Sequence, residues 1–387
     1  MRRIGRILLR ILVIFVAVAL ALGLYMREEI ARLWTVNTLF EAEYIVENFS
    51  HMDEAFLTVE VPRGDGPVSP LPEGAPADLP DAVATWIEER AVTSLVVVHG
   101  GEIVHESYHL GTGAEDRRIS WSVAKSFLSA LLGTLVADGT IPDLDTPVTE
   151  YAPLLEGTAY DGATIRSVLQ MTSGVTFDED YLDYNSDINR MGREIALGGT
   201  LDGFTAALME TDGPAGEDWQ YVSIDTHVIG MVIRGATGRD IPSLLSERII
   251  APLGLESTPY YLTDGEGVAF VLGGLNMTTR DYARMGMMFL RNGNWNDQQI
   301  LTENWVVEST AASAPTDPGE IGYGYQWWIP VGAETGQFMA RGIYGQYVYV
   351  DQVNDVVIAT TGADRQFRED GVNEENVRIF RLIAESL

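Results

Sequence analysis

The 387-residue sequence contains no cysteine, which excludes disulfide bonds, thiolate metal ligands, a cysteine nucleophile and a lipid-bearing cysteine. Lysine is almost absent: Lys125 is the only one, and every other basic residue is an arginine. The 25 basic residues stand against 56 acidic ones, for a net charge of −31. Such a charge argues against nucleic acid as a partner, because its phosphates would be repelled, and is more typical of solubility or adaptation to salt.

The single lysine follows Ser122 by three residues, within the stretch 119–128. Apolar residues at four-residue spacing after it predict a helix that ends at Gly139. Ser122 and Lys125 would then share one face at the first turn of this helix. A desolvated lysine can act as a base near neutral pH, whereas an arginine cannot. The spacing therefore predicts a serine nucleophile activated by Lys125; the alternative is two ordinary helix residues left by composition drift.

The N-terminus predicts a membrane segment. Several arginines precede residues 11–26, an uncharged run that, with the apolar residues before it, just reaches the roughly 17–25 residues that span a bilayer. Arginines are expected to stay in the cytoplasm, so the remainder of the chain would be exported. The alternative is a signal peptide cleaved near Ala19-Leu20-Ala21, followed by secretion. The length of the run favours an uncleaved anchor in the inner (cytoplasmic) membrane, with the catalytic part in the periplasm.

The rest of the chain is expected to form one antiparallel sheet with helices on its faces. A hairpin over 94–108 and strands between 322 and 361 come from opposite ends of the chain, with a mainly helical region at about 140–255 between them. This order indicates an α/β (α+β) fold. We divide the chain into a membrane anchor or signal segment (1–28), an arm followed by a proline-rich linker (29–80), and a catalytic domain (81–387).

Tyr221 is a second candidate for the site. It lies in the polar turn 219–223, just before a predicted helix over 226–235. A phenol near a lysine ammonium can be held as the phenolate or can relay a proton. A tyrosine that packs at the edge of the core is an equally good interpretation on the local sequence alone.

Together these motifs resemble the serine hydrolases of the class C beta-lactamase and penicillin-binding-protein superfamily. The matching stretches are Ser122-Val123-Ala124-Lys125, Tyr221-Val222-Ser223 and the glycine-rich segment 342–347, and the likeness covers roughly residues 80–385. Within this superfamily the chain is most similar to 6-aminohexanoate-dimer (nylon-oligomer) hydrolases and related carboxylesterases. The resemblance implies a beta-lactamase/transpeptidase-like fold and hydrolysis of an ester or small linear amide through an acyl-enzyme, without a metal or other cofactor.

The resemblance also implies roles for single residues. Ser122 would be the acylated nucleophile, Lys125 its base, and Tyr221 the group that carries a proton to the leaving group. The backbone N–H groups of Ser122 and Ile343 would form the oxyanion hole. The residues expected to contact the substrate are Ser223, Gly342 and Tyr344.

Two positions depart from the beta-lactamase pattern. The Lys-Thr-Gly strand motif is replaced by Ala340-Arg341-Gly342, and Ser223 stands where an asparagine is usual. Arg341 could still supply a positive charge, unless the alternation of the strand points its side chain away. Both departures weaken the alternative of a beta-lactamase or D-Ala-D-Ala peptidase. A second alternative is an envelope scaffold or sensor that uses the same fold without activity.

The sequence contains motifs of other enzyme and metal-binding classes, but none of them predicts a different chemistry. His105-Glu106-Ser107-Tyr108-His109 matches the H-E-x-x-H zinc motif, but it alternates like a strand, which would place the histidines ~13 Å apart. No serine has a glycine two residues before it, which excludes a G-x-S-x-G hydrolase. His227 is expected on a helix face, and the acidic residues of 178–187 are expected in a solvated loop rather than a calcium site.

Overall fold

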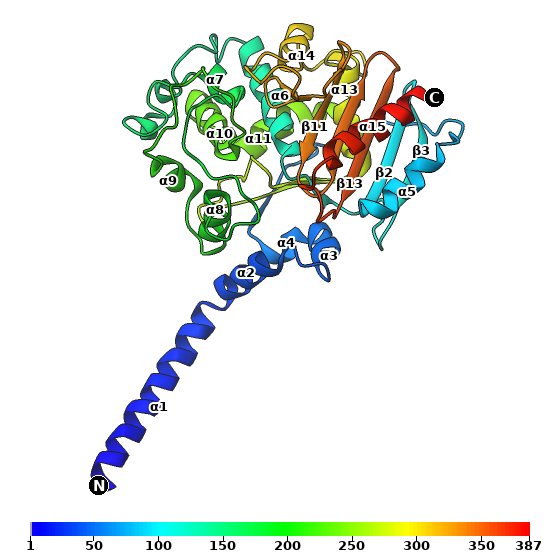
Figure 1. Ribbon diagram of the computed structural model, residues 1–387. Coiled ribbons are helices and arrows are strands. Elements are labelled where there is room, and N and C mark those ends of the chain that lie inside the picture. Colours follow the sequence, from blue (N-terminus) through cyan, green and yellow to red (C-terminus); the bar gives the residue numbers. More distant parts are fainter. Residues whose placement is uncertain (1) are drawn as a thin grey trace.

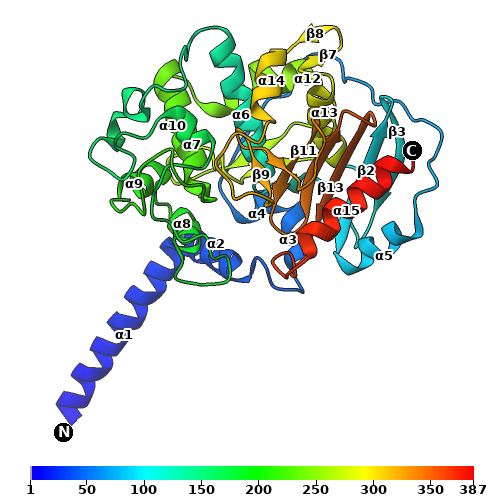
Figure 2. The same cartoon turned by 45° about the horizontal axis from the view of Figure 1, so that its top comes forward.

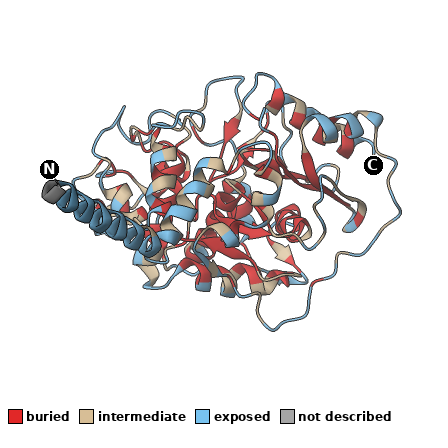
Figure 3. Cartoon of the chain, turned by 90° about the horizontal axis from the view of Figure 1, so that it is seen from below, coloured by how far each residue is buried: buried red, intermediate tan, exposed pale blue. Residues whose placement is uncertain are grey.

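The computed structural model describes residues 2–387. Helix α1 (Arg2–Tyr25) projects from a rounded body (Figure 1). Nearly all of Gly5–Tyr25 is exposed (Figure 3), and within the described residues it is the one helix long and apolar enough to cross a membrane. A break at Met26 separates α1 from α2 (Arg27–Thr38), which continues into the arm, and α3 (Ile45–Ser50) and α4 (Met52–Ala55) follow.

The body is built on an antiparallel sheet of strands from both ends of the chain, as predicted. Its order is β3-β2-β13-β12-β11-β10-β9. Gly100 and Gly101 both adopt positive φ angles, which a tight turn between twisted strands requires. The strands are β2 (Val92–His99), β3 (Glu102–Tyr108), β9 (Gly322–Tyr323), β10 (Trp328–Ile329), β11 (Gln337–Gly342), β12 (Gln346–Asp351) and β13 (Val356–Gly362).

Helices cover both faces of this sheet. On one face lie α6 (Val123–Ala137) and α13 (Thr279–Leu290), whose residues are almost all buried. On the other lie α5 (Asp81–Glu89) and α15 (Val372–Glu385), and Figures 1 and 2 show α15 lying across it. Phe380 of α15 connects this second layer to the sheet, because its ring centroid lies 5.2 Å from that of Tyr347 on β12. The fold is thus the beta-lactamase/transpeptidase-like arrangement expected from the sequence.

A mainly helical region packs beside α6 and brings the second half of the site to it. It holds α7 (Ile165–Leu169), α8 (Asp187–Ala196), α9 (Leu201–Ala206), α10 (Ser223–Thr237), α11 (Ile241–Leu245) and α12 (Ala251–Leu253). Helix α10 begins at Ser223, two residues after Tyr221 and three residues earlier than predicted. The short α14 (Glu303–Ser309) and the two-stranded β7 (Asn294–Trp295) and β8 (Gln298–Gln299) lie at the periphery.

A second sheet, which the sequence did not lead us to expect, ties the arm to the body. Its order is β1-β5-β6-β4, and it pairs Thr58–Glu60 (β1) with Tyr260–Leu262 (β5). Leu275–Met277 (β6) and Arg118–Ile119 (β4) complete it. Because β4 leads straight into Ser122, the arm and the start of α6 belong to one packed unit. Buried Leu39 and Phe49 of the arm join the same apolar cluster as Ile119.

Candidate active site

Ser122 lies at the N-cap of α6, where backbone N–H groups have no partner within the helix. Its side chain is half-buried. The preceding residue, Trp121, has a φ of +43°, a left-handed conformation that bulky residues rarely adopt. Strained backbone of this kind concentrates at functional sites, because surrounding packing must hold it in place. Here it turns the chain sharply between β4 and α6 and presents Ser122 at the surface of a cavity.

Lys125 lies one turn further along α6 and is 1% exposed. Its Nζ donates a hydrogen bond to the carbonyl oxygen of Leu272 at 2.9 Å. Burial lowers the pKa of the Lys125 ammonium to about 7, although the negative charges of Glu179 and Asp225 oppose this. A substantial fraction of the amine is therefore neutral near pH 7, as a general base requires.

Tyr221 completes a compact trio with Ser122 and Lys125. The Lys125 Nζ lies 5.5 Å from the centroid of the Tyr221 ring, which also stacks on Trp328 at 5.0 Å. Burial and the nearby charge of Glu179 raise the pKa of the Tyr221 phenol, while hydrogen bonding with Ser122 lowers it. The net direction is upward. Of the two forms left open by the sequence, the neutral phenol that relays a proton is therefore favoured over a standing phenolate.

Gly342, the last residue of β11, and Ile343 after it lie next to Ser122. A Cβ atom built on Gly342 would lie 2.5 Å from the carbonyl oxygen of Ser120 and 3.1 Å from the amide nitrogen of Ser122. Any larger side chain would therefore occupy the space in front of the Ser122 N–H. Gly342 and Ile343 line a cavity of about 330 Å³ together with Ser122 and Tyr221.

Ser223 and Tyr344, the other two residues predicted to contact the substrate, lie in different surroundings. Ser223 is buried, and its hydroxyl donates to Glu179 while its amide donates to the other Glu179 oxygen at 3.0 Å. Tyr344 packs in an aromatic cluster, stacked on Phe40 at 4.8 Å and 4.5 Å from the Phe367 ring. Its role in binding substrate stays a prediction, since it supports the walls of the site rather than lining the cavities described here.

Glu179 is a site residue that the sequence did not single out. It sits in the acidic run that we expected to be a solvated loop, yet it accepts hydrogen bonds from Ser223 and from the Tyr181 hydroxyl. It also lines the cavity of Ser122. In the sequence it is distinguished from its neighbours only as the single glutamate of this acidic run.

Asp225 was missed as well, although it lies four residues after Tyr221 on α10. It is fully buried and accepts hydrogen bonds from Tyr160 at 2.7 Å and Ser173 at 2.8 Å. Burial raises the pKa of its carboxyl group to about 7, against the opposing effects of these donors and of Lys125. Asp225 thus supplies a negative charge near Lys125, and this charge is itself sensitive to pH.

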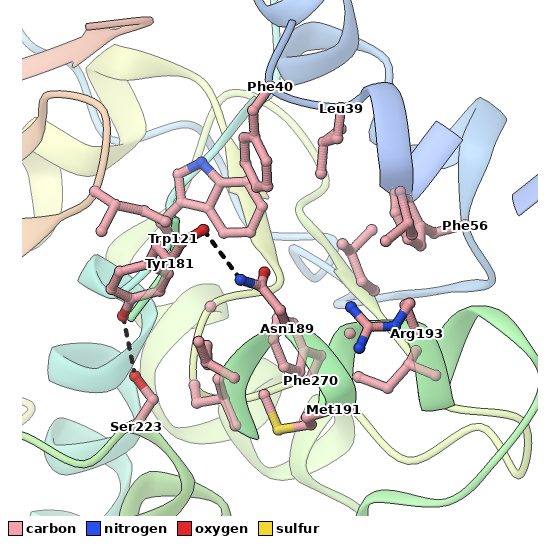
Figure 4. A pocket seen from close by; sticks show the side chains of 18 of the residues that line it. Leu39, Phe40, Phe56, Trp121, Tyr181, Asn189, Met191, Arg193, Ser223 and Phe270 are labelled. Atoms are coloured by element: carbon pink, nitrogen blue, oxygen red, sulfur yellow. Dashed lines mark hydrogen bonds between the residues drawn. The ribbon is translucent and has the colours of Figure 1, made fainter. Parts of the chain in front are cut away.

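Two cavities meet at Ser122. The first, described above, is the more polar of the two, although Trp328 and Phe367 also line it, and we call it the polar cavity. It contains Glu179, Tyr221 and Arg341, with the Arg341 guanidinium 4.9 Å from the Trp328 ring. Arg341 therefore does not point wholly away from the site. The second has a volume of about 260 Å³ and is mostly apolar (Figure 4). Ser122, Tyr181 and Ile343 line both cavities.

The competing motifs are accounted for by other contacts. His105 and His109 lie in or next to β3 rather than on a helix, and each hydrogen-bonds the Ser107 hydroxyl at 3.0 Å. His227 is buried against Asp202, with its Nε2 2.7 Å from the carboxylate. Across residues 2–387, no cluster of three or more histidine, aspartate or glutamate residues is arranged to hold a metal ion.

The family profile of the beta-lactamases matches residues 83–379. The chain belongs to the beta-lactamase family. It is 32% identical over 346 residues to the 6-aminohexanoate-dimer hydrolase of Paenarthrobacter ureafaciens, a match that covers 84% of this chain and 86% of that protein. The sequence resemblance is thereby confirmed, and the chain is a serine hydrolase of the amide and ester type.

Solved structures agree on the fold. A Bacillus anthracis protein provisionally named a 6-aminohexanoate-dimer hydrolase superposes with a TM-score of 0.80 at 24% identity, covering 90% of this chain and 95% of that one. A penicillin-binding protein homologue from Pyrococcus abyssi superposes with a TM-score of 0.56 at 17% identity, covering 78% and 76%.

Proposed function

We propose that Ser122, Lys125 and Tyr221 hydrolyse an ester or small linear amide through an acyl-enzyme. Neutral Lys125 accepts the proton of the Ser122 hydroxyl as its oxygen bonds to the substrate carbonyl carbon. The bond to the leaving group then breaks, and the leaving oxygen or nitrogen takes a proton from the Tyr221 phenol, which regains one from Lys125. Water attacks the acyl-enzyme by the same relay in reverse. The observation that carries this proposal is the position of Lys125: it is the only lysine of the chain, it is buried, and it lies one helical turn from Ser122.

The oxyanion of each tetrahedral intermediate would be bound by the backbone N–H groups of Ser122 and Ile343. The start of α6 adds a favourable partial positive charge. Gly342 supports this role because it leaves open the space before the Ser122 amide. Ser223 and Glu179 would hold the polar side of the substrate cavity in place.

The departures from the beta-lactamase pattern support esters or linear amides as substrates. No lysine besides Lys125 is available to bind a substrate carboxylate, and Arg341 is engaged with the Trp328 ring. A beta-lactam or a D-Ala-D-Ala peptide carries such a carboxylate. We therefore place the chain with the esterase and 6-aminohexanoate-dimer-hydrolase branch.

We further propose that α1 remains as an anchor in the inner membrane, with the catalytic body in the periplasm and a small molecule as its only substrate. The length and hydropathy of Gly5–Tyr25 support a membrane span. Alkaline carbonate extraction tests this. An anchored chain stays in the membrane pellet at full mass, whereas a soluble chain that begins after Ala21 would contradict it.

A fluorophosphonate probe tests the catalytic assignment. It should label Ser122 in the full chain, and Ser122→Ala should lose all labelling while Ser386→Ala, at an exposed position, keeps it. Failure to label correctly folded protein would refute the enzyme and leave an inactive scaffold. Turnover of nitrocefin faster than that of p-nitrophenyl butyrate would refute the assignment to esters and linear amides.

A further inference from the structure

The apolar cavity beside Ser122 has walls from segments far apart in the sequence. The arm contributes one wall, α8 a second, and residues 270–273 a third. Figure 4 shows side chains from all three turned toward the same space. Those that define it are Leu39, Phe40, Phe56, Met191, Ile195 and Phe270. Asn189 and Arg193 of α8 also line the chamber, but the Arg193 guanidinium lies over the Tyr184 ring, 3.8 Å from its centroid, and most of the lining is apolar. Such a chamber favours a hydrocarbon over a charged or strongly hydrated group.

Tyr221 indicates which part of a substrate belongs in this chamber. The phenol lines the polar cavity and not the apolar one. If Tyr221 protonates the leaving group, then the leaving group lies in the polar cavity. The acyl part, bonded to Ser122 between the two cavities, must then extend into the apolar chamber.

The mouth of the chamber lies on the side of the body where α1 joins it. Leu182 and Tyr184 line the chamber and yet are 73% and 58% exposed. Trp34 on α2 is also exposed, 59%, and Figure 1 shows α2 and α8 together next to the body end of α1. If α1 is embedded in a bilayer, these apolar side chains face the membrane surface. An amphiphile dissolved there could enter with its chain first.

We propose that the substrate is an amphiphile: a medium-chain acyl group, held in the apolar chamber, joined by an ester or amide bond to a polar alcohol or amine in the cavity of Glu179 and Arg341. This rests on the proposed function and adds the chemical class of the substrate. Hydrolysis transfers the acyl group from the leaving oxygen or nitrogen to Ser122 and then to water, which yields a carboxylic acid and the free alcohol or amine.

A series of p-nitrophenyl esters from acetate to dodecanoate tests the proposal, with the full chain held in lipid nanodiscs. Each methylene that enters the chamber should raise kcat/KM by about fourfold, so that hexanoate exceeds acetate by on the order of 100-fold. The rise should stop once the chamber is filled. A series that is flat or that falls from acetate onward would overturn the proposal.

Gly192 on α8 offers a way to fill the chamber. It lines the cavity, its φ is not positive, and a Cβ built on it meets no atom within 4 Å. In Gly192→Phe the ratio of hexanoate to acetate kcat/KM should fall at least tenfold. The matched control is Gly66→Phe, an exposed and equally unobstructed glycine outside the chamber, which should keep the parent ratio. An unchanged ratio in Gly192→Phe would contradict the assignment of the chamber.

The proposal can fail separately from the catalytic assignment. If a small fluorophosphonate does not label Ser122, the proposed function fails. If Ser122 is labelled and acetate is hydrolysed, but chain length has no effect, only the amphiphile is refuted.

Discussion

Replacing Lys125 by methionine should abolish activity and raise stability together. Methionine keeps an unbranched stem of similar length but carries no charge. Burial lowers the Lys125 pKa from 10.5 to about 7, and this difference corresponds to roughly 5 kcal/mol of destabilisation at pH values below the folded pKa, where the lysine is protonated in both the folded and the unfolded chain. The loss of the hydrogen bond to the Leu272 carbonyl offsets about 1–3 kcal/mol of the gain. The net gain at pH 6 is roughly 2–4 kcal/mol.

The gain in stability from Lys125→Met should be larger at low pH than at high pH. The burial penalty of Lys125 is complete below its folded pKa of about 7 and shrinks as pH rises toward 10.5, where the unfolded lysine also loses its proton. At pH 9 the penalty is roughly 2 kcal/mol, which the lost hydrogen bond would cancel. Lys125→Met should therefore melt about 3–5 °C above the parent at pH 6 and close to it at pH 9, given the unfolding entropy of a 387-residue chain.

Thermal unfolding followed by circular dichroism at the two pH values measures this difference. Ser122→Ala is the control, because it also disables the site but removes no buried charge. Its melting temperature should stay near that of the parent at both pH values. A Lys125→Met variant that is no more stable than the parent at pH 6, or that gains more at pH 9, would refute the view that Lys125 is held desolvated.

Two further predictions concern activity. In Tyr221→Phe the ring should keep its contact with Trp328 but lose the proton relay, so that kcat for a small linear amide, whose amine must be protonated to leave, falls by about 10²–10⁴ while the melting temperature changes little; a variant within threefold of the parent would remove Tyr221 from the mechanism. The kcat/KM of the parent should rise about tenfold per pH unit below 7 and level off above, as Lys125 loses its proton. A pH profile that is flat between 5 and 8 would contradict this.

The sheet and its covering helices could be predicted because each carries its own periodicity or turn signal. The hairpin over 94–108 is an example: alternating residues flank Gly100-Gly101, and the structure places a strand on each side. Ser122 and Lys125 could be paired for the same local reason, since one helical turn separates them. The short motifs around them then resembled those of a known family, and this resemblance predicted the family of the whole chain.

The rest of the site depends on contacts that no local pattern records. Glu179 belongs to the site because the amide and the hydroxyl of Ser223, which is distant in the sequence, both donate to it. Asp225 lies just before the helix predicted over 226–235, and its burial against Tyr160 and Ser173 follows from packing alone. Likewise, nothing in the arm predicts that Phe40 stacks on Tyr344 beside the glycine-rich turn.

The arm has a consequence for how relatives are compared. The family profile begins at residue 83, but Leu39, Phe40 and Phe56, which wall the apolar chamber, lie before it. Alignments trimmed to the shared domain therefore discard part of the chamber wall. On the proposal above, two relatives with identical catalytic domains but different arms would prefer different acyl chains, and exchanging their arms would transplant that preference.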